Sequence, residues 1–512
     1  MALNQKIKNI DELAGILEKL KRSGKKIIHC HGVFDLIHPG HIRHFHAAKA
    51  LGDILVVTIT PDKYVNKGPG RPVFTEALRA EVIAALESVN YVAINLWPTA
   101  VETIKILKPD IYVKGRDYVD PEKDETRGIS FEKEAVELVG GEIHFTDDIT
   151  FSSSSLLNEY FEIYPEPAQA FLRSFRKEHS VDEIIEKLKG LKNVRVLTIG
   201  ETILDKYAFM APLIGKPPKG SHIAARFLSE ETHAGGILAC ANHLASFCGS
   251  VDVITAIGND GKEEFVRSHL KPNVNLNLFY YDKAPTIIKK RFIDSTFLSK
   301  MFEEYVIDDR LASELERQIK AHLTDIFPKS EHYDLILVLD YGHGLLTPDL
   351  IEFICSQEKF LVINAQTNTA NMGFNLITKY RRANYFCLDD RELRLAFHDN
   401  YGEINSLIEQ LAGRVSLPGG ISVTRGHLGV TTYNVKNRSF FEAPVLSQKI
   451  VDTTGAGDAF LALTAPCVAR GFPMDLVAFI GNAAGALAVG VLGNRFSIET
   501  APFFKFITAL LK

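Results

Sequence analysis

The order of apolar and polar positions in the first 60 residues predicts a strand, a helix and a second strand. Residues 10–20 have apolar side chains at helical spacing, and residues 25–30 are typical of a short buried strand after a basic turn. A helical pattern over residues 42–51 and another apolar run over residues 53–59 follow. A strand, a glycine-containing turn, a helix and a strand in this order form a parallel βαβ unit. The N-terminal part is therefore predicted to be an α/β domain.

The chain after residue 193 repeats this alternation over a longer stretch. Apolar runs typical of buried strands occupy residues 194–199, 251–258, 335–340, 361–364 and 421–424. Stretches with helical spacing separate them. This pattern predicts an α/β domain with a doubly wound sheet, in which ligands bind at the carboxyl ends of the strands.

The length of 512 residues is enough for two to four domains. We expect a first domain over residues 1–160, a helical linker over residues 161–192 and a second domain over residues 193–512. The linker begins with an aromatic, acidic and proline-containing stretch and continues with two helical patterns. Nothing in it indicates chemistry.

Charge and composition limit the kinds of binding partner and the cellular compartment that we expect for this protein. The net charge of -5 and the pI of about 6.4 argue against nucleic acid or a membrane surface as the main partner. The six cysteines lack CxxC spacing and are expected to be reduced thiols of a cytoplasmic protein. The first 15 residues have no apolar core and do not form a signal peptide. The apolar run over residues 476–493 is long enough to suggest a membrane span, but its content of Ala, Gly and Val favours a buried core helix.

The most specific chemical pattern lies in residues 451–460, where two hydroxyl residues precede a Gly-Ala-Gly turn, a carboxylate and a helix-forming run. Small residues let backbone N–H groups converge on an anion at a helix N-terminus. Asp458 is placed to take a proton from an attacking hydroxyl, as phosphoryl transfer requires. The alternative is a glycine-bearing turn before a buried helix. The string closely resembles the catalytic loop of ribokinase-like (PfkB-type) sugar kinases. The resemblance implies that Asp458 is the catalytic base and that the backbone of Gly455, Ala456 and Gly457 binds phosphate.

Other parts of residues 193–512 resemble the same family and imply a ribokinase-like fold. Asp205 follows an early strand, where a carboxylate can hold sugar hydroxyls or merely cap a loop. Carboxylates at i and i+3, as at Asp389 and Glu392, can hold the water shell of Mg²⁺ near a phosphate site. The resemblance implies sugar contacts by Asp205, Gly235, Gly236 and Asn242, nucleotide contacts by Thr424, Gly426 and Asn482, and a Mg²⁺ site at Asp389 and Glu392.

Several positions depart from this family's pattern, and most lie on the sugar or transferred-phosphate side. The Asn expected after the Gly-Gly helix start is Ala239, and the Lys of an Asp-Tyr-x-Lys-Gly segment is His343. The Asp-Pro-Lys segment is Asn364-Ala365-Gln366, and the loop over residues 215–222 does not match heptose kinases. Either the sugar is not the usual heptose 7-phosphate, or the kinase is weak and the domain has another role.

In the first domain, His38, Gly40 and His41 form a His-x-Gly-His motif at a predicted helix start. Two imidazoles there can donate hydrogen bonds to a nucleotide's phosphates, and Gly40 allows a close approach. They would stabilise charge on an α-phosphate under attack and on the departing pyrophosphate. Six histidines lie between His29 and His46, so a transition-metal site is the alternative. No cysteine or carboxylate cluster nearby in the sequence completes a tetrahedral ligand set.

Two further segments suit anions: a basic, glycine-rich loop over residues 67–73 and a serine-rich run over residues 151–156 at a helix start. In this order the motifs resemble the heptose 1-phosphate adenylyltransferase and glycerol-3-phosphate cytidylyltransferase group, which has a Rossmann-like fold. The strongest resemblance is to the nucleotidylyltransferase half of the bifunctional heptose enzymes of lipopolysaccharide-precursor synthesis, although His31 stands where that half usually has Asn. The resemblance implies catalytic roles for His38 and His41 and nucleotide contacts by Gly32, Phe34, Lys67, Arg71, Lys114, Ser153 and Ser154.

The two resemblances together imply a bifunctional enzyme. The kinase would use Mg²⁺ and ATP to phosphorylate a sugar phosphate at its anomeric hydroxyl, and the transferase would join the sugar 1-phosphate to a nucleotide from ATP or CTP. In the familiar bifunctional heptose enzyme the kinase comes first, and here the order is reversed. Two alternatives stay open: the same reactions on another sugar or polyol phosphate with CTP, or an active transferase with a non-catalytic, metabolite-binding kinase-like domain. The resemblance also suggests a homodimer.

Overall fold

The computed structural model describes residues 3–65, 67–68, 71–115, 128–146, 164–213, 223–281, 283–308, 313–327, 333–447 and 450–512. The chain forms two compact units. One contains Met1–Glu166 together with Ala501–Lys512, and the other contains Pro167–Thr500.

The N-terminal unit contains a five-stranded parallel sheet in the order β3-β2-β1-β4-β5. The predicted strand–helix–strand unit is confirmed, because β1 pairs in parallel with β2 through the intervening helix α3. The strand order reverses between β1 and β4, where an open α/β sheet forms a crevice at its carboxyl edge. The strands are β1 (Ile27–Gly32), β2 (Ile54–Ile59), β3 (Tyr91–Ile94), β4 (Ile111–Gly115) and β5 (Glu142–Thr146).

Helices cover both faces of this sheet because its central strands are apolar on both sides. Phe45 of α3 and Ile83 of α4 pack with Cys30 in one buried cluster. Leu13 of α2 packs with Val56 in another buried cluster. The helices are α1 (Leu3–Lys6), α2 (Ile10–Arg22), α3 (Pro39–Ala50), α4 (Glu76–Ala84), α5 (Val101–Leu107) and α6 (Gly128–Leu138).

The larger unit contains a nine-stranded sheet in the order β10-β9-β6-β13-β14-β15-β16-β17-β18, which confirms the predicted doubly wound domain. The pairs from β10 to β16 are parallel, and β17 and β18 add antiparallel strands. The strands are β6 (Arg195–Gly200), β9 (Ser250–Gly258), β10 (Val274–Tyr281), β13 (Leu335–Asp340), β14 (Leu361–Ala365), β15 (Tyr385–Asp389), β16 (Gly420–Thr424), β17 (Val430–Asn434) and β18 (Ser439–Ala443).

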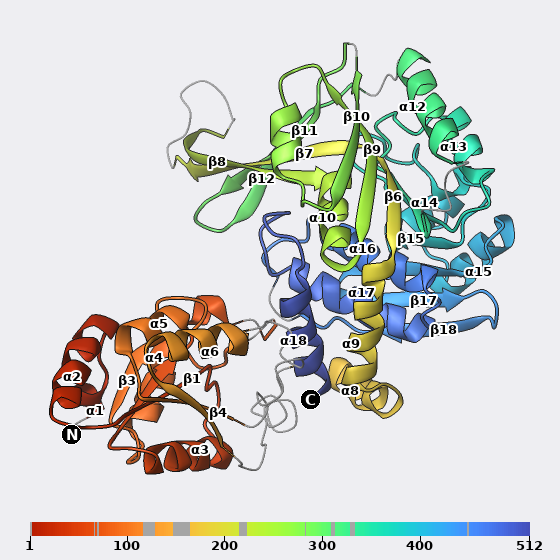
Figure 1. Cartoon of the computed structure of the whole chain (residues 1–512). Helices are drawn as coiled ribbons and strands as arrows, with labels where there is room; N and C mark the ends of the chain where they lie inside the picture. The colour runs from red at the N-terminus through yellow and green to blue at the C-terminus, as the bar shows by residue number, and fades with distance from the viewer. Residues whose placement is uncertain are drawn as a thin grey trace. The chain divides into compact units, whose positions relative to one another are not determined.

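Two sets of helices contact this sheet (Figure 1). One set contributes to a large buried cluster that includes Ile319 and Leu411. It comprises α12 (Ser313–Ile326), α13 (Pro348–Cys355), α14 (Asp390–Phe397) and α15 (Ile404–Arg414). The other set comprises α10 (Ile237–Phe247), α16 (Ala456–Ala469) and α17 (Met474–Ala488).

A second sheet of four strands, in the order β12-β11-β7-β8, belongs to the same unit and was not predicted. Asp205 was expected at the carboxyl end of a strand of the doubly wound sheet, and that expectation was wrong. The strand β6 ends at Gly200, and Asp205 lies inside the following strand of the small sheet. The strands are β7 (Thr202–Pro212), β8 (Ala225–Gly236), β11 (Ile287–Asp294) and β12 (Ser299–Val306).

Three other expectations are confirmed. The apolar run that begins at residue 476 lies in the buried helix α17, and among the described residues no helix has the length and apolarity needed to cross a bilayer. All six cysteines are free thiols, and all but Cys355 are buried. The two helical patterns after residue 160 form α8 (Glu166–Glu178) and α9 (Val181–Lys189).

Candidate active sites

The glycine turn of residues 455–457 forms the N-terminus of α16, as predicted. Gly455 is the N-cap residue, with a positive φ of 82°, and no side chain caps this helix end. A Cβ at Gly455 would lie 2.0 Å from Asn494 Oδ1, so the close approach requires glycine. Ala456 and Gly457 lie in the first helical turn. This helix end offers backbone N–H groups and the positive end of a helix dipole to an anion.

Asp452 holds the segment before the turn in place. Its Oδ1 accepts hydrogen bonds from the backbone N–H of Thr454 at 3.1 Å and from the Thr454 hydroxyl at 3.0 Å. Its Oδ2 accepts from Tyr207 Oη at 2.9 Å and from the backbone N–H of Gly493 at 3.1 Å. These bonds lower the pKa of Asp452 against the opposing effect of burial.

Asp458 is buried in the first turn of α16 and receives two hydrogen bonds. Tyr341 Oη donates to its Oδ1 at 2.9 Å, and Gln366 Nε2 donates to the same oxygen at 3.4 Å. Burial, reinforced by the charge of Asp205, raises the pKa of Asp458 to about 7, while Tyr341, Lys289 and Gln366 act in the opposite direction. A carboxylate that titrates near neutral pH is well suited to general base catalysis.

Asp205 lies in β7 of the small sheet, and Asn494 links it to the glycine turn of residues 455–457. Arg291 Nη1 of β11 lies 2.5 Å from its Oδ1, and Asn494 Nδ2 donates to its Oδ2 at 3.2 Å. A Cβ at Gly235 would lie 2.1 Å from Oδ2, so the predicted Gly235 allows the close approach of the β8 backbone. Asn494 contacts both Asp205 and Gly455 and was missed by the sequence analysis, because no local pattern marks it.

Two predicted contact residues have structural partners. Asn242 donates to the carbonyl of His269 at 2.7 Å and accepts from the backbone N–H of Lys271 at 3.0 Å, so its amide holds the loop after α11 (Glu263–Ser268). Asn482 of α17 donates to the carbonyls of Ala443 and Pro444 at the end of β18. Neither contacts Asp205 or Asp458 through a hydrogen bond among the described residues.

Two residues of the predicted nucleotide and Mg²⁺ sites, Asp389 and Thr424, lie at the ends of β15 and β16 and pair in register. Gly426 follows with a positive φ of 55° in the short turn before β17.

Asp389 and Glu392 form a capping box at the start of α14, because each side chain accepts a hydrogen bond from the other's backbone N–H. The second oxygen of Glu392 accepts from the backbone N–H of Thr367 at 3.0 Å. Burial and the neighbouring Asp389 raise the pKa of Glu392 to about 8. Burial raises the pKa of Asp389, while backbone hydrogen bonds from Glu392 and Arg391 act in the opposite direction. The pair therefore fits Mg²⁺ through its water shell and not as a direct multidentate ligand.

Of the departures from the kinase pattern, Gln366 contacts the proposed base, while the backbone of His343 and the side chain of Asn364 have other partners. The backbone N–H groups of Tyr341 and His343 donate to the buried Glu201 at 3.0 and 3.1 Å. Asn364 donates to the carbonyl of Cys387 at 2.9 Å. Gln366 reaches Asp458 itself, so a neutral amide lies beside the carboxylate.

In the N-terminal unit, the His-x-Gly-His motif lies beyond the carboxyl end of β1. The helix α3 begins at Pro39 and not at residue 42 as expected, because proline at the first helical position is preorganised for a helix. His38 is the N-cap residue and His41 lies in the first turn. Their rings are stacked with centroids 3.8 Å apart, and Phe34 packs edge-on against His41 at 5.3 Å.

Both imidazoles are shifted toward the neutral form. Burial, with a smaller effect of the Lys67 charge, lowers the pKa of His38. Burial lowers the pKa of His41 to about 3, aided by His38, His44 and Lys67. A neutral imidazole carries one N–H that can donate to a phosphate oxygen.

The presence of His31, where the related transferases usually have Asn, is explained by its contacts with the neighbouring strand. Its ring nitrogens lie 2.9 Å from Thr58 Oγ1 and 3.2 Å from Thr60 Oγ1 on the neighbouring strand β2 and just after it. Burial lowers the pKa of His31 well below the usual range. The ring is therefore a neutral bridge between threonines.

The other predicted nucleotide contacts lie around the same strand ends. Gly32 allows the ring of Phe34 to approach, since a Cβ there would lie 2.9 Å from Phe34 Cζ. Arg71 Nη1 lies 3.6 Å from Asp35 Oδ2, and Lys114 at the end of β4 forms a 2.9 Å ion pair with Glu132. The predicted Ser153 and Ser154 lie outside the described residues.

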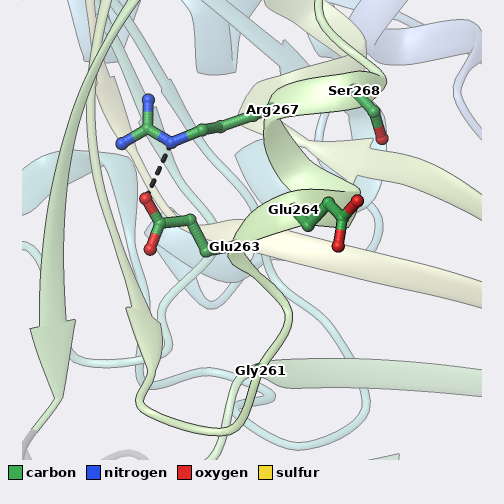
Figure 2. A pocket seen from close by; sticks show the side chains of 5 residues that line it. All are labelled: Gly261, Glu263, Glu264, Arg267 and Ser268. Carbon is green, nitrogen blue, oxygen red and sulfur yellow. Dashed lines mark hydrogen bonds and ion pairs between the residues drawn. The ribbon is translucent and has the colours of Figure 1, made fainter.

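A surface hollow beside α11 is shown in Figure 2. Arg267 Nε donates to Glu263 Oε1 at 2.7 Å on the same short helix, and both side chains are well exposed. None of the predicted site residues lines this hollow, and an exposed pair of this kind contributes little energy. We assign no function to it. Its lining residues are Gly261, Glu263, Glu264, Arg267 and Ser268.

Comparison with known proteins agrees with the two sites. Residues 195–501 match the pfkB family carbohydrate kinase profile, and residues 29–182 match the cytidylyltransferase-like profile. The first match defines a ribokinase-like sugar kinase domain and the second a nucleotidyltransferase-like domain. The chain belongs to the pfkB family of carbohydrate kinases.

Among curated proteins, the chain is 40% identical over 167 residues to the "Bifunctional protein HldE" of Geobacter metallireducens, an alignment that covers 31% of this chain and 32% of that protein. It is 42% identical over 141 residues to the protein of the same name from Helicobacter pylori, covering 26% of this chain and 30% of that protein. These alignments fall in the N-terminal part, so the order of the two domains is reversed relative to those proteins. The alignments span about a third of the relatives' length.

Among solved structures, the phosphofructokinase-2 of Escherichia coli in complex with potassium aligns with a TM-score of 0.50 at 14% identity. The alignment covers 62% of this chain and 99% of that chain. At this identity the likeness shows the fold alone.

Proposed function

We propose that the chain makes an activated nucleotide-sugar in two consecutive reactions. The C-terminal domain transfers a phosphoryl group from ATP to the anomeric hydroxyl of a sugar phosphate. The N-terminal domain then joins that sugar 1-phosphate to a nucleotide from ATP or CTP. The product is of the ADP-heptose type, a precursor of lipopolysaccharide or another cell-surface glycan. The pairing of a pfkB domain with a cytidylyltransferase-like domain supports this proposal.

The kinase step is supported above all by one observation, the buried carboxylate of Asp458 at an uncapped helix N-terminus. Asp458 accepts the proton of the sugar hydroxyl as its oxygen attacks the γ-phosphorus. The backbone N–H groups of Gly455, Ala456 and Gly457 stabilise the charge that develops on the transferred group. In the same proposal Asp389 would hold the water shell of a Mg²⁺ ion, and that ion would supply positive charge to the phosphates of ATP.

Sugar and nucleotide are held on the two sides of that helix end. Asp205 and the backbone of Gly235 and Gly236 bind the sugar, and a buried carboxylate suits hydroxyl donors. The ends of β15 and β16, with Thr424 and Gly426, bind the nucleotide.

In the transferase step, an oxygen of the sugar 1-phosphate attacks the α-phosphorus and pyrophosphate leaves. His38 and His41 donate hydrogen bonds to the phosphate oxygens, and Lys67 and Arg71 neutralise the leaving pyrophosphate. Their placement beside the reversal of strand order between β1 and β4 supports this assignment.

A second candidate is an active transferase with a kinase-like domain that binds a metabolite without phosphorylating it. The amide of Gln366 beside Asp458 favours this candidate, because it stands where the family's motif has a lysine. A neutral amide stabilises phosphoryl-transfer charge less than a cation does.

Product analysis by mass spectrometry separates the two candidates. The purified chain would receive Mg²⁺, ATP or CTP and a panel of heptose, hexose and pentose phosphates, with His38→Ala and Asp458→Asn variants alongside. The proposal expects a nucleotide-sugar from the wild type, a sugar bisphosphate that accumulates with His38→Ala, and neither product with Asp458→Asn. A nucleotide-sugar formed only from ready-made sugar 1-phosphates, and unaffected by Asp458→Asn, would favour the second candidate.

A further inference from the structure

The helix α18 (Thr500–Leu511) follows the kinase domain in sequence but belongs to the N-terminal unit. The match to the kinase family ends at residue 501, and Ala501–Lys512 forms part of the compact N-terminal unit. The transferase unit therefore contains a segment that lies more than 300 residues after the rest of its sequence.

This helix packs on the basic loop that was predicted to suit anions, at Gly68. The ring of fully buried Phe506 lies against Gly68: a Cβ at Gly68 would lie 2.0 Å from Phe506 Cδ2. Gly68 has a positive φ of 92°, so both its conformation and this contact require glycine.

The same helix adds positive charge to the loop. Burial, together with the charges of Arg71, Lys512 and Lys505, lowers the pKa of Lys67 to about 8, while Asp35 acts in the opposite direction. Arg71, Lys505, Lys512 and the carboxylate of Asp35 thus all lie close enough to Lys67 to act on it electrostatically.

The carboxylate of Asp35 already has hydrogen-bond and ion-pair partners within its own domain. Asp35 Oδ1 accepts hydrogen bonds from the backbone N–H groups of Val73 and Phe74 at 2.7 and 3.1 Å, and its Oδ2 faces Arg71. Lys67 also lowers the pKa of both His38 and His41, which places Lys67 close to the histidine motif. Like charges gathered at such a site repel one another until a polyanion binds.

We propose that α18 completes the triphosphate site of the transferase, with Lys505 and Lys512 binding the β- and γ-phosphates that leave as pyrophosphate and Phe506 fixing the loop at Gly68. This inference rests on the proposed transferase function. Lys505 and Lys512 are both exposed side chains of this unit.

The test is calorimetric titration of the full chain with inorganic pyrophosphate at two salt concentrations. A Lys505→Ala/Lys512→Ala variant is compared with Lys19→Ala/Lys133→Ala, which removes the same charge from exposed positions on α2 and α6. Hydrogen–deuterium exchange of the peptide over residues 67–73 locates the binding. We expect about tenfold weaker binding for the first variant, a smaller salt dependence, and control affinity within about twofold of wild type.

Equal affinities for the two double variants, with pyrophosphate protecting residues 67–73 in both, would overturn the role of α18 and leave the transferase assignment intact. A wild-type chain in which pyrophosphate fails to protect residues 67–73 would overturn both. Because the replaced lysines are exposed, the variants are expected to fold, and circular dichroism verifies this.

Discussion

Tyr341 Oη donates a 2.9 Å hydrogen bond to Oδ1 of Asp458, and both side chains are buried. Tyr341 directly follows β13, and Asp458 lies in the first turn of α16, so the bond links the end of a central strand to the proposed base. The bond favours the ionised carboxylate and keeps the pKa of Asp458 from rising above about 7.

Removing this hydroxyl should make the kinase more sensitive to acid. In Tyr341→Phe the pKa of Asp458 rises, because the charged form loses a donor. The pH at which kcat/KM falls to half therefore moves upward, and at pH 6.5 the rate drops by about threefold to tenfold. The measurement is the pH profile of sugar phosphorylation for wild type and variant. An unchanged acid limb would contradict the role of Asp458 as the titrating base.

Substitution of Gly455 and of Gly457 by alanine should affect different properties, stability in the first case and kinase activity in the second. Gly455→Ala places a Cβ 2.0 Å from Asn494 Oδ1 at a positive φ, so we expect a loss of about 2 kcal/mol or more in the free energy of unfolding. Gly457→Ala meets no atom within 4 Å and should leave stability almost unchanged.

The extra methyl group of Gly457→Ala nevertheless lies in the first turn of the helix, where the phosphoryl group must approach. We expect kinase kcat/KM to fall by about tenfold or more in this stable variant. Thermal unfolding and kinase assays on both variants check the pair. Equal stability losses at the two positions would refute the stated geometry.

The buried Arg291–Asp205 pair should be costly to break. Arg291→Met leaves Asp205 buried without its cation, and removing one partner of a buried pair costs about 3–5 kcal/mol. Lys290→Met is the matched control, since Lys290 pairs with Glu230 at a more exposed position and should cost about 1 kcal/mol or less. Urea unfolding followed by circular dichroism measures both. If the double variant Arg291→Met/Asp205→Asn is no more stable than Arg291→Met, the charge pair is not the source of the loss.

The buried histidines should make the N-terminal unit labile in acid. Burial lowers the pKa of His29 and of His41 to about 3, below the value near 6.5 of the unfolded chain. The unfolded state therefore binds more protons once the pH falls below about 6.5, and stability falls until about pH 3. At pH 5 each such histidine costs about 2 kcal/mol relative to pH 7.

The single tryptophan, Trp97, lies in this unit, so its fluorescence follows the unfolding of this unit in urea. We expect a lower urea midpoint at pH 5 than at pH 7. His29→Gln, which keeps a polar side chain near Thr58, should reduce the pH dependence. A midpoint independent of pH between 5 and 7 would show that these histidines are not held neutral.

The parts predicted well from sequence are those encoded by local chemistry. The helical spacing predicted over residues 10–20 lies in α2, and the glycine turn at Gly455 begins α16, because apolar spacing and small residues act within a few positions. The strand–turn–helix that carries His38 and His41 was also predicted, although Pro39 starts the helix earlier than expected.

The small sheet could not be predicted in this way. Its strand β8 has a long exposed segment and owes its conformation to pairing with β7, so it shows no strict alternation of buried positions. Contacts between residues far apart in the chain could likewise not be predicted from the sequence. Asn494 meets Asp205 across 289 positions, and His31 meets Thr58 across a strand pair. In the same way, no pattern in residues 501–512 indicates that they belong with the N-terminal unit.

The central claim is that one chain makes the sugar 1-phosphate in its kinase domain and consumes it in its transferase domain. The most direct test mixes two inactive variants, Asp458→Asn and His38→Ala, with Mg²⁺, nucleoside triphosphate and the acceptor sugar phosphate, and follows nucleotide-sugar by mass spectrometry. We predict that neither variant alone forms the product and that the mixture does, because the sugar 1-phosphate released by His38→Ala is used by Asp458→Asn. Product formation by Asp458→Asn alone from the sugar phosphate, or none from the mixture while the wild type is active, would contradict the account.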